Sequence, residues 1–445
     1  MVTNAQRSFF RWTWFRAWFP VLFFLAYWAN SYFNYHFGLL IRDPLMPQTY
    51  FYLWGSMALF ILGYAIGLGR PKRVMVGHST QVWRLNENVF KYLGLLMWVT
   101  FIGAIGLVVD RLLSGAGSVA KTLKETEFVR QEYASNTTIG TTISMALYAF
   151  SFVTYSTYFL AVATRYAMPK YYHLMIYGTY VALCFSSFLT ANRGNFFSVF
   201  TYVAFMIFYV QGSSLKEFLF TKRYRIFRIT GIVFVILAFV YFFFISRYRS
   251  TEDGLVSDAS YYRPVDRYGL YKMNFDEHDV TAFLTTYTYM TEGYQYVDAF
   301  LKKAPFVSFR PSMLIGVRTL RQFWRFLPGG FERDLSAVRV GNTWRLEDGM
   351  SIYGWPTIWG WNLAMFGYFG AVLFMFCYGW WLGYCSGLFL RFASLGALMV
   401  CFANYSVLMN SYNSLGGDVF HQVAIFVGVW VLVSTYKHRR FMCLH

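Results

Sequence analysis

Long apolar runs alternate with short polar segments along most of the chain, and this alternation predicts membrane-spanning helices. A helix needs about 20 mainly apolar residues to cross the hydrocarbon core of a bilayer. We therefore expect an all-α polytopic membrane protein with about ten transmembrane helices, and more if re-entrant pieces are present. The runs cover residues 17–37, 50–69, 92–110, 140–162, 172–190, 195–212, 228–246, 362–384, 393–411 and 419–436.

One polar interval, residues 247–361, is far longer than the others and divides the chain. Residues 1–246 before it form a membrane domain with spans one to seven. Residues 362–445 after it hold spans eight to ten and a terminal tail. Loops this long are uncommon without a function of their own. The interval is therefore expected to be a large loop with amphipathic helices, and the part of the chain that carries chemistry.

Composition supports the membrane interpretation. The chain is 57% hydrophobic and 22% aromatic but only 13% charged, whereas soluble domains carry roughly 25% charged residues. The formal net charge of +18 would usually suggest nucleic-acid binding. Here the basic residues lie mainly in short loops between apolar runs, so we expect no nucleic-acid partner. None of the five cysteines lies in the long loop, so no disulfide framework is expected.

The charges divide unevenly between the two sides that the ten runs define. One set of loops carries 19 of the 39 Lys and Arg residues but only Glu87 and Glu217 among the acids. The opposite side holds the remaining basic residues together with nearly all the acids. Because short cytoplasmic loops are rich in Lys and Arg, we assign the first side, including the N- and C-termini, to the cytoplasm. The long loop then lies outside.

The basic half of the long loop contains a helix pattern that is suited to phosphate. Residues 311–327 begin with Pro-Ser and stop before Pro-Gly-Gly, as a helix would. Arg318, Arg321 and Arg325 then share one face. Guanidinium groups bind phosphate oxygens in pairs, so this face could hold a diphosphate. Alternatively the helix lies on the bilayer surface and its arginines reach anionic headgroups. The two interpretations are compatible with each other.

Arg193 is a second candidate for binding phosphate. It lies in Thr190-Ala-Asn-Arg-Gly194, in the short turn between spans five and six at their outer ends. An arginine at that depth is costly unless it faces a cavity or a phosphate, and Gly194 lets the backbone turn closely. The alternative is an interfacial arginine that only caps the turn. Arg247 and Arg249, where the long loop begins, could assist.

Aromatic residues of the loop suggest a site that binds sugars. Trp344, Trp355, Trp359 and Trp361 lie near Asn342 and Arg345. Flat rings contact sugar faces, and amide or guanidinium groups contact hydroxyls. By themselves, however, the residues favour an interfacial aromatic belt.

Three groups of acids compete for chemical roles. Glu292, between Tyr289 and Tyr296, could act as a general base, with Glu347 and Asp348 as rivals. Asp276–Asp279 is more often a solvated turn than a metal site. The chain has no H-E-x-x-H, P-loop or G-x-S-x-G motif, which argues against proteases, ATPases and esterases.

Three short motifs resemble the Wzy-type oligosaccharide repeat-unit polymerases, which build O-antigen and capsular polysaccharides. The motifs are Thr190-Ala-Asn-Arg-Gly194, Tyr289 to Gly293 with Asp298-Ala-Phe-Leu301, and Asn342-Thr-Trp344 with Phe366-Gly-Tyr-Phe-Gly370. Their order and spacing agree with that family across roughly residues 140–390, whereas the remainder matches only as generic membrane helices. One departure is Asn362, because the family usually has an acid before the Phe-Gly-x-x-Gly element.

The resemblance implies a GT-C-like fold in a bacterial inner membrane, with the long loop in the periplasm. It implies transfer of a glycan from undecaprenyl diphosphate to a sugar hydroxyl of another lipid-linked repeat. Because members of the family act without metal, we expect no cofactor. They commonly work with a co-polymerase that regulates chain length, which is the protein partner that the resemblance implies. The catalytic candidates are Arg193, Arg318 and Glu292. The substrate-binding candidates are Arg247, Arg249, Arg321, Arg325, Tyr289, Asn342, Trp344, Arg345 and Trp355.

Three other functions compete with a polymerase. An O-antigen ligase shares the expected fold and donor, but its loop usually carries a histidine motif, and here the loop has only His278. A GT-C transferase that uses a lipid monophosphate usually has acids in its first outside loop, where Asp43 stands alone. A transporter of lipid-linked oligosaccharides would favour internal repeats and short loops, and neither is found in the sequence.

Overall fold

The apolar runs of the sequence form α-helices in the computed structural model. The structure describes residues 14–38, 44–69, 87–113, 139–163, 168–189, 194–225, 357–392, 394–409 and 419–438, with parts of 228–240 and 293–302. Within these residues the regular structure is helical and contains no strand. The expectation of an all-α chain is confirmed for this part of the protein.

Helix bounds follow the predicted runs closely in the first half of the chain. The helices are α2 (Trp14–Phe37), α3 (Pro47–Leu68), α4 (Glu87–Leu113), α7 (Ile139–Tyr148), α8 (Ser151–Ala163), α9 (Lys170–Leu189) and α10 (Gly194–Ala204). A π-helical turn, η1 (Phe205–Val210), continues α10. The short helices α11 (Leu215–Phe220) and η2 (Lys222–Tyr224) follow. The predicted fourth run is divided between α7 and α8.

Three helices form the end of the chain: α18 (Thr357–Phe392), α19 (Leu395–Met409) and α20 (Val419–His438). The helix of the predicted eighth span thus begins at Thr357, within the stretch that was expected to be loop. It is interrupted at Gly367, whose φ of 69° and ψ of 179° are not helical. This backbone conformation is essentially confined to glycine.

Four helical stretches of the described residues are long and apolar enough to cross a membrane: Pro47–Leu68, Tyr92–Leu113, Gly140–Ala163 and Phe366–Arg391. Ser198–Val210, Leu395–Met409 and Phe420–Ser434 are apolar but shorter. Each stretch falls on a predicted run. This is consistent with a helical membrane protein, whereas the number of about ten spans and the GT-C-like fold stay predictions.

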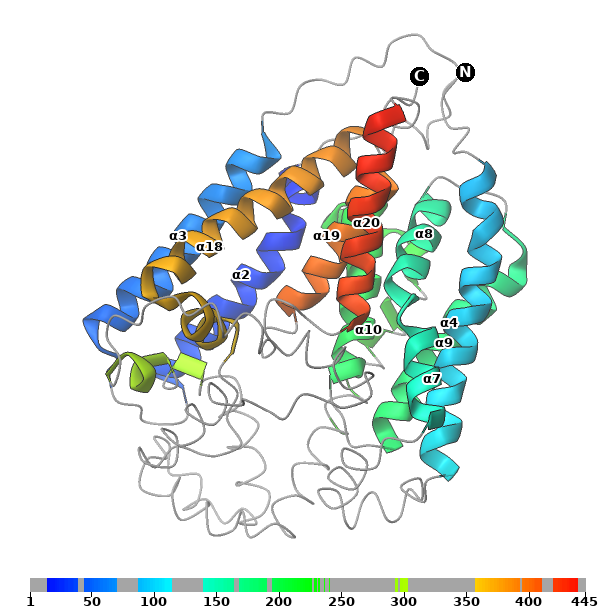
Figure 1. Ribbon diagram of the computed structural model, residues 1–445, viewed down its shortest axis with the longest axis horizontal. Helices are drawn as coiled ribbons and strands as arrows, with labels where there is room; N and C mark the ends of the chain where they lie inside the picture. Colours follow the sequence, from blue (N-terminus) through cyan, green and yellow to red (C-terminus); the bar gives the residue numbers. More distant parts are fainter. Residues whose placement is uncertain are drawn as a thin grey trace.

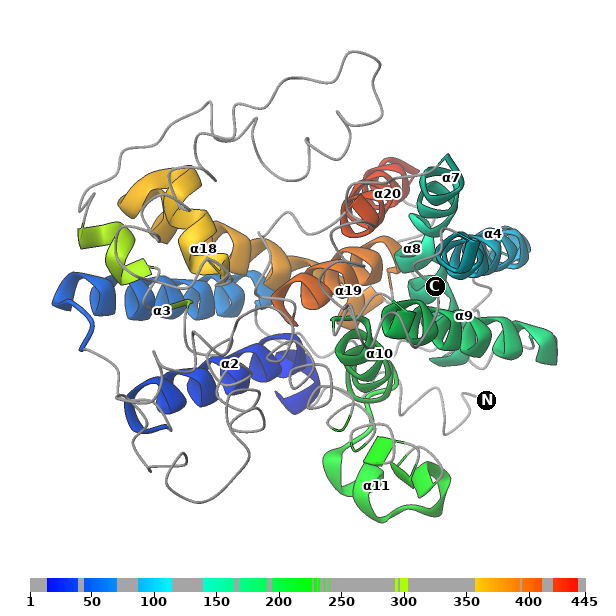
Figure 2. The ribbon, with the colours of Figure 1, turned by 90° about the horizontal axis from the view of Figure 1, so that it is seen from below.

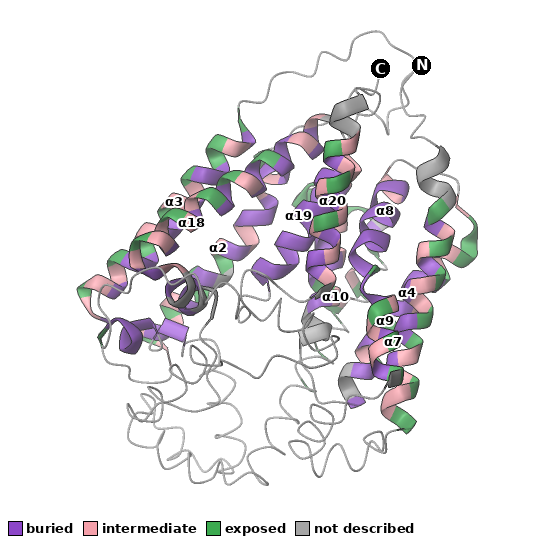
Figure 3. Ribbon diagram, viewed as in Figure 1, coloured by how far each residue is buried: buried purple, intermediate pink, exposed green. Residues whose placement is uncertain are grey.

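Large apolar side chains are exposed along the outward faces of the helices. On α4 the exposed residues Leu95, Trp98, Ile102, Ile105 and Val109 recur every three or four positions. They therefore form one stripe along the helix, and Figure 3 shows exposed positions on the outward side of α3 and α4. A continuous apolar surface of this kind would be unfavourable in water. It suits contact with lipid.

The helices form two groups with a central one between them (Figures 1 and 2). α2, α3 and α18 lie on one side, and α4, α7, α8 and α9 on the other. α10, α19 and α20 lie between the groups, and α19 contacts helices of both.

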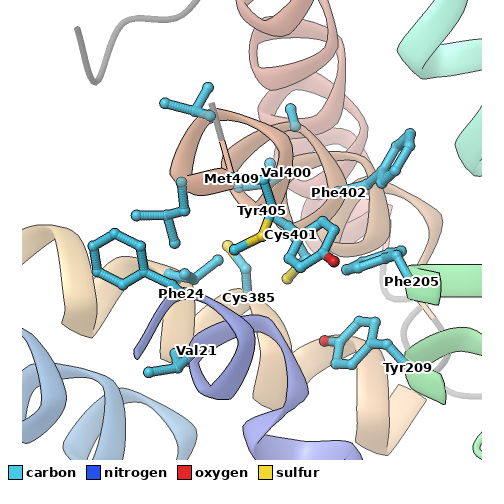
Figure 4. Packing of buried hydrophobic residues seen from close by; sticks show 14 of the residues in the cluster. Val21, Phe24, Phe205, Tyr209, Cys385, Val400, Cys401, Phe402, Tyr405 and Met409 are labelled. Carbon is cyan, nitrogen blue, oxygen red and sulfur yellow. The ribbon is translucent and has the colours of Figure 1, made fainter. Parts of the chain in front are cut away.

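α19 is the innermost of the three central helices, since every residue from Gly396 to Met409 is buried. Its side chains fill the centre of the bundle (Figure 4). The ring of Phe205 lies 5.1 Å from that of Phe402 and 4.8 Å from that of Tyr405.

Contacts between helices fix their relative directions. Tyr52 of α3 reaches Trp359 near the start of α18, and Leu68 at the end of α3 meets Arg391 near the end of α18, so the two helices are parallel. α19 and α20 are antiparallel, because Gly396 meets Gly428 while Ser406 meets His421. We call the end of the bundle where α3, α10, α18 and α20 begin the loop end. It lies at the bottom of Figure 1 and corresponds to the side predicted to be outside.

The opposite end is held by arginines that bind helix carbonyl groups. Arg16, which is buried, donates from Nε to the carbonyl of Tyr209 and from Nη2 to that of Val210, each at 2.7 Å. Arg391 donates to the carbonyl of Leu68 at 2.6 Å. The last carbonyls of a helix have no partner within it and attract cations. Both arginines belong to the set assigned to the cytoplasm, so part of that basic set stabilises helix ends.

Candidate functional site at the loop end

The residues that the sequence singled out for catalysis and substrate binding lie outside the described residues. The same holds for Asp276–Asp279, Glu347 and Asp348. The catalytic and substrate-binding candidates outside the described residues are Arg193, Arg318, Glu292, Arg247, Arg249, Arg321, Arg325, Tyr289, Asn342, Trp344, Arg345 and Trp355.

Three described parts of the chain lie next to these candidates in the sequence. Gly194, which follows Arg193, begins α10, and Thr357, which comes two residues after Trp355, begins α18. Between them, part of the segment 293–302 of the long loop follows Glu292 directly. All three belong to the loop end, because α10 and α18 begin there and the loop segment contacts the start of α3.

The described part of the long loop is anchored on the start of α3. The carboxylate of Asp298 accepts hydrogen bonds from the backbone N–H of Met46 and from Thr49 Oγ1, each at 2.7 Å. Asp298 is only 4% exposed. Its second oxygen pairs with Lys302 at 3.0 Å, one helical turn further along the same segment. The loop and the second predicted span are therefore joined by a buried carboxylate.

The sequence of α3 explains why this carboxylate is needed. The helix begins with Pro47, and the preceding residue, Met46, has no side chain that could accept a hydrogen bond from the first turn. The first N–H groups of a helix lack internal partners and carry a partial positive charge. Asp298 supplies both an acceptor and a negative charge there. Because it already accepts from three donors, we interpret Asp298 as an anchor rather than as a general base.

Aromatic rings surround this anchor. Tyr294 donates from its hydroxyl to the carbonyl of Trp28 at 3.3 Å. Its ring makes edge contacts with Trp28, Tyr35 and Tyr32 of α2, at centroid distances of 5.2, 5.5 and 6.1 Å. Tyr35 and Tyr294 are buried. The segment is thus held on α2 by ring packing and on α3 by the Asp298 carboxylate.

Trp359 does not present a face to a sugar, contrary to the grouping of tryptophans expected from the sequence. It is 1% exposed, and its ring packs against Trp28 at 4.9 Å and Phe24 at 6.3 Å. Its backbone carbonyl accepts from Tyr52 at 2.8 Å. Trp359 therefore belongs to the core, because α18 begins before the predicted span.

Asn362 lies five residues before Gly367, the point where α18 is interrupted. It is buried, and its amide nitrogen contacts Met375 Sδ at 3.3 Å. Phe366 stacks on Phe374 at 4.3 Å. The first turns of α18 therefore fold against the helix that follows Gly367. A carboxylate in this apolar setting would be more costly than a neutral amide, which gives a physical reason for asparagine here.

A second set of rings at the loop end remains partly exposed. His36 lies between Tyr32, at 4.5 Å, and Tyr50, at 5.8 Å between ring centroids. Tyr32 also contacts Trp54 at 5.1 Å, and Trp54 is 54% exposed. Such rings could contact sugars or form part of an interfacial aromatic belt. Sequence reasoning missed this set because its residues lie in the first two apolar runs.

Asp298 was also missed as a site residue, although two signals were available. It precedes Lys302 by four residues, which is the spacing of a helical ion pair, and α3 lacks a capping residue of its own. Neither signal predicts that Asp298 contacts Met46, which lies 252 residues away in the sequence.

Among the described residues, no group of three His, Cys, Asp or Glu side chains could hold a metal ion. The expectation of a reaction without cofactor stays a prediction. No family model matches the chain, and searches of curated proteins and of solved structures found no match.

Replacing Asp298 with alanine is expected to destabilise the loop end. The change leaves the N–H of Met46 and the hydroxyl of Thr49 without their acceptor, which costs about 1–3 kcal/mol. Lys302→Ala is the matched control, because Lys302 is 55% exposed and an exposed ion pair contributes about 1 kcal/mol or less. Thermal unfolding of the purified variants measures both. Equal stability of the two variants would contradict the anchor.

Proposed function

We propose that the protein is a polymerase of oligosaccharide repeat units linked to undecaprenyl diphosphate. It would act in a bacterial inner membrane, with both termini in the cytoplasm and the long loop in the periplasm. The product would be an O-antigen, a capsule or a related surface polysaccharide. Membrane lipids surround such an enzyme, and a co-polymerase that regulates chain length is the protein partner we expect.

The observation that carries the proposal is the anchor of the long loop. Asp298, the first residue of the Asp298-Ala-Phe-Leu301 motif of the resemblance, binds the start of α3 through its carboxylate. Glu292 directly precedes Gly293 in the sequence, so the anchor limits how far that residue can lie from the bundle. A loop that handles a lipid-linked substrate needs such an attachment close to the membrane.

The proposed reaction requires little beyond positioning and charge. A sugar hydroxyl of one lipid-linked repeat attacks the anomeric carbon of another and gives its proton to a general base. The bond from that carbon to the diphosphate oxygen breaks, and undecaprenyl diphosphate leaves with the electron pair. Arg193 and Arg318, helped by Arg321, Arg325, Arg247 and Arg249, would stabilise the negative charge that develops on the diphosphate. Trp344 and Trp355 would hold sugars.

Purified protein incubated with lipid-linked repeats and analysed on a gel tests this function. A ladder of products supports the polymerase, a single transfer to a lipid core would indicate a ligase, and no new product would indicate a transporter. A parallel reaction with EDTA should give the same ladder. Loss of the ladder in EDTA would bring Asp276–Asp279 back as a metal site.

A further inference from the structure

Three polar side chains from three helices meet near the loop end of the bundle. His421 of α20 lies with Nε2 3.0 Å from Ser406 Oγ of α19. The same Ser406 oxygen lies 3.2 Å from the hydroxyl of Tyr202 of α10. All three are buried, His421 at 5% exposure. His421 lies two residues after the start of α20, and Ser406 three residues before the end of α19.

The surroundings of this group are aromatic. Phe152 of α8 packs on the imidazole at 4.4 Å between ring centroids, and it also contacts Tyr202 at 5.5 Å. A titratable side chain within a predicted span is costly to bury, and such residues usually mark a functional path.

We propose that His421 accepts, through Ser406, the proton of the sugar hydroxyl that attacks during chain extension. This inference rests on the proposed function. As the sugar oxygen bonds to the anomeric carbon, its hydrogen passes to Ser406 Oγ, and the Ser406 hydrogen passes to Nε2 of His421. The diphosphate leaves with the electron pair of the broken bond. The imidazolium then gives its proton to the released diphosphate, which restores the site.

The position of the group agrees with this role. Tyr202 belongs to α10, which begins at Gly194, the residue after Arg193 in the sequence. The proton-accepting group and the turn proposed to bind diphosphate are therefore connected through one helix. Glu292, the base that the sequence suggested, lies outside the described residues.

The titratable groups behind His421 on the neighbouring helices are mainly tyrosines. Tyr202 of α10 contacts the ring of Tyr155 of α8 at 5.9 Å. The Tyr155 hydroxyl lies 3.2 Å from that of Tyr148 of α7. Tyr180 of α9 contacts Tyr155 at 5.1 Å, and Cys184 lies on the same helix. A free imidazole titrates near neutrality, whereas phenol and thiol groups in general titrate at higher pH.

The test measures initial rates of ladder formation between about pH 5.5 and 9, a range that covers the titration of an imidazole, for four variants. His421→Gln and Ser406→Ala should each lower the rate about 100-fold or more, because general base catalysis is typically worth that much. Tyr202→Phe should lower it only several-fold, since Tyr202 orients Ser406. His173→Gln is the matched control: His173 bonds to a tyrosine hydroxyl at 2.7 Å, at the opposite end of the bundle.

The pH profile separates a proton-accepting role from a structural one. The wild-type rate should fall in acid as the imidazole becomes protonated, and His421→Gln should lose that acidic limb. A His421→Gln variant with the wild-type rate and limb would overturn the role of His421 while leaving the polymerase intact. A wild-type protein that forms no ladder would overturn the proposed function and this inference with it.

Discussion

Arg193→Ala and Arg318→Ala are each expected to abolish polymer while the protein remains in the membrane at its normal level. Diphosphate is a good leaving group only when its developing charge is stabilised, and removing one preorganised donor typically costs about 100- to 1,000-fold in rate. Every added repeat requires another transfer. A loss of this size should therefore remove long products altogether. Gel analysis of cells that carry only the variant measures the outcome.

Two controls make the arginine prediction specific. Lysine at position 193 or 318 keeps the charge but not the paired donors, so Arg→Lys variants should retain short products. Arg225→Ala removes an exposed arginine beside η2, at the opposite end of the bundle, and should leave the ladder unchanged. Normal ladders from both Arg193→Ala and Arg318→Ala would rule out diphosphate binding by these residues.

The helices were the part of the fold that the sequence predicted well. α4 and α9 contain the predicted runs almost entirely, because a long apolar stretch with a 3.6-residue period has few other stable structures. The positions of the interruptions inside helices were not predicted. One break separates α7 from α8, and the other lies at Gly367 of α18. A hydropathy average over a window of residues changes little at a single residue, so it does not show where a helix is interrupted.

The candidate site was predicted less well, for two physical reasons. Asp298 acts through Met46 and Thr49, and no local pattern connects residues so far apart in the chain. His421, Ser406 and Tyr202 lie in three different apolar runs, and a single polar residue in such a run does not predict which residue it contacts. Only the structure shows that the three side chains contact one another and could transfer a proton. The predicted arginines lie outside the described residues and stay predictions.

The contact between α3 and α18 depends on glycines that allow the two backbones to touch. A Cβ atom at Gly67 would overlap the carbonyl oxygen of Trp380, and one at Gly63 would overlap that of Phe376. Gly379 and Gly383 meet the backbone of α3 in the same way. Small residues spaced four apart let membrane helices approach closely, and association there depends on close packing rather than on a hydrophobic driving force.

Gly67→Leu is therefore expected to separate α3 from α18 and to abolish a stable, monodisperse protein. Gly55→Leu is the matched control, because a Cβ atom at Gly55 meets nothing within 4 Å. Both changes lie in α3 and give the same gain in helix propensity, so the difference between them reports packing alone. Size-exclusion chromatography and thermal unfolding in detergent provide the measurement. Because α18 also carries Trp359 and Asn362, separation should disturb the loop end as well; equal behaviour of the two variants would show that the backbones need not touch.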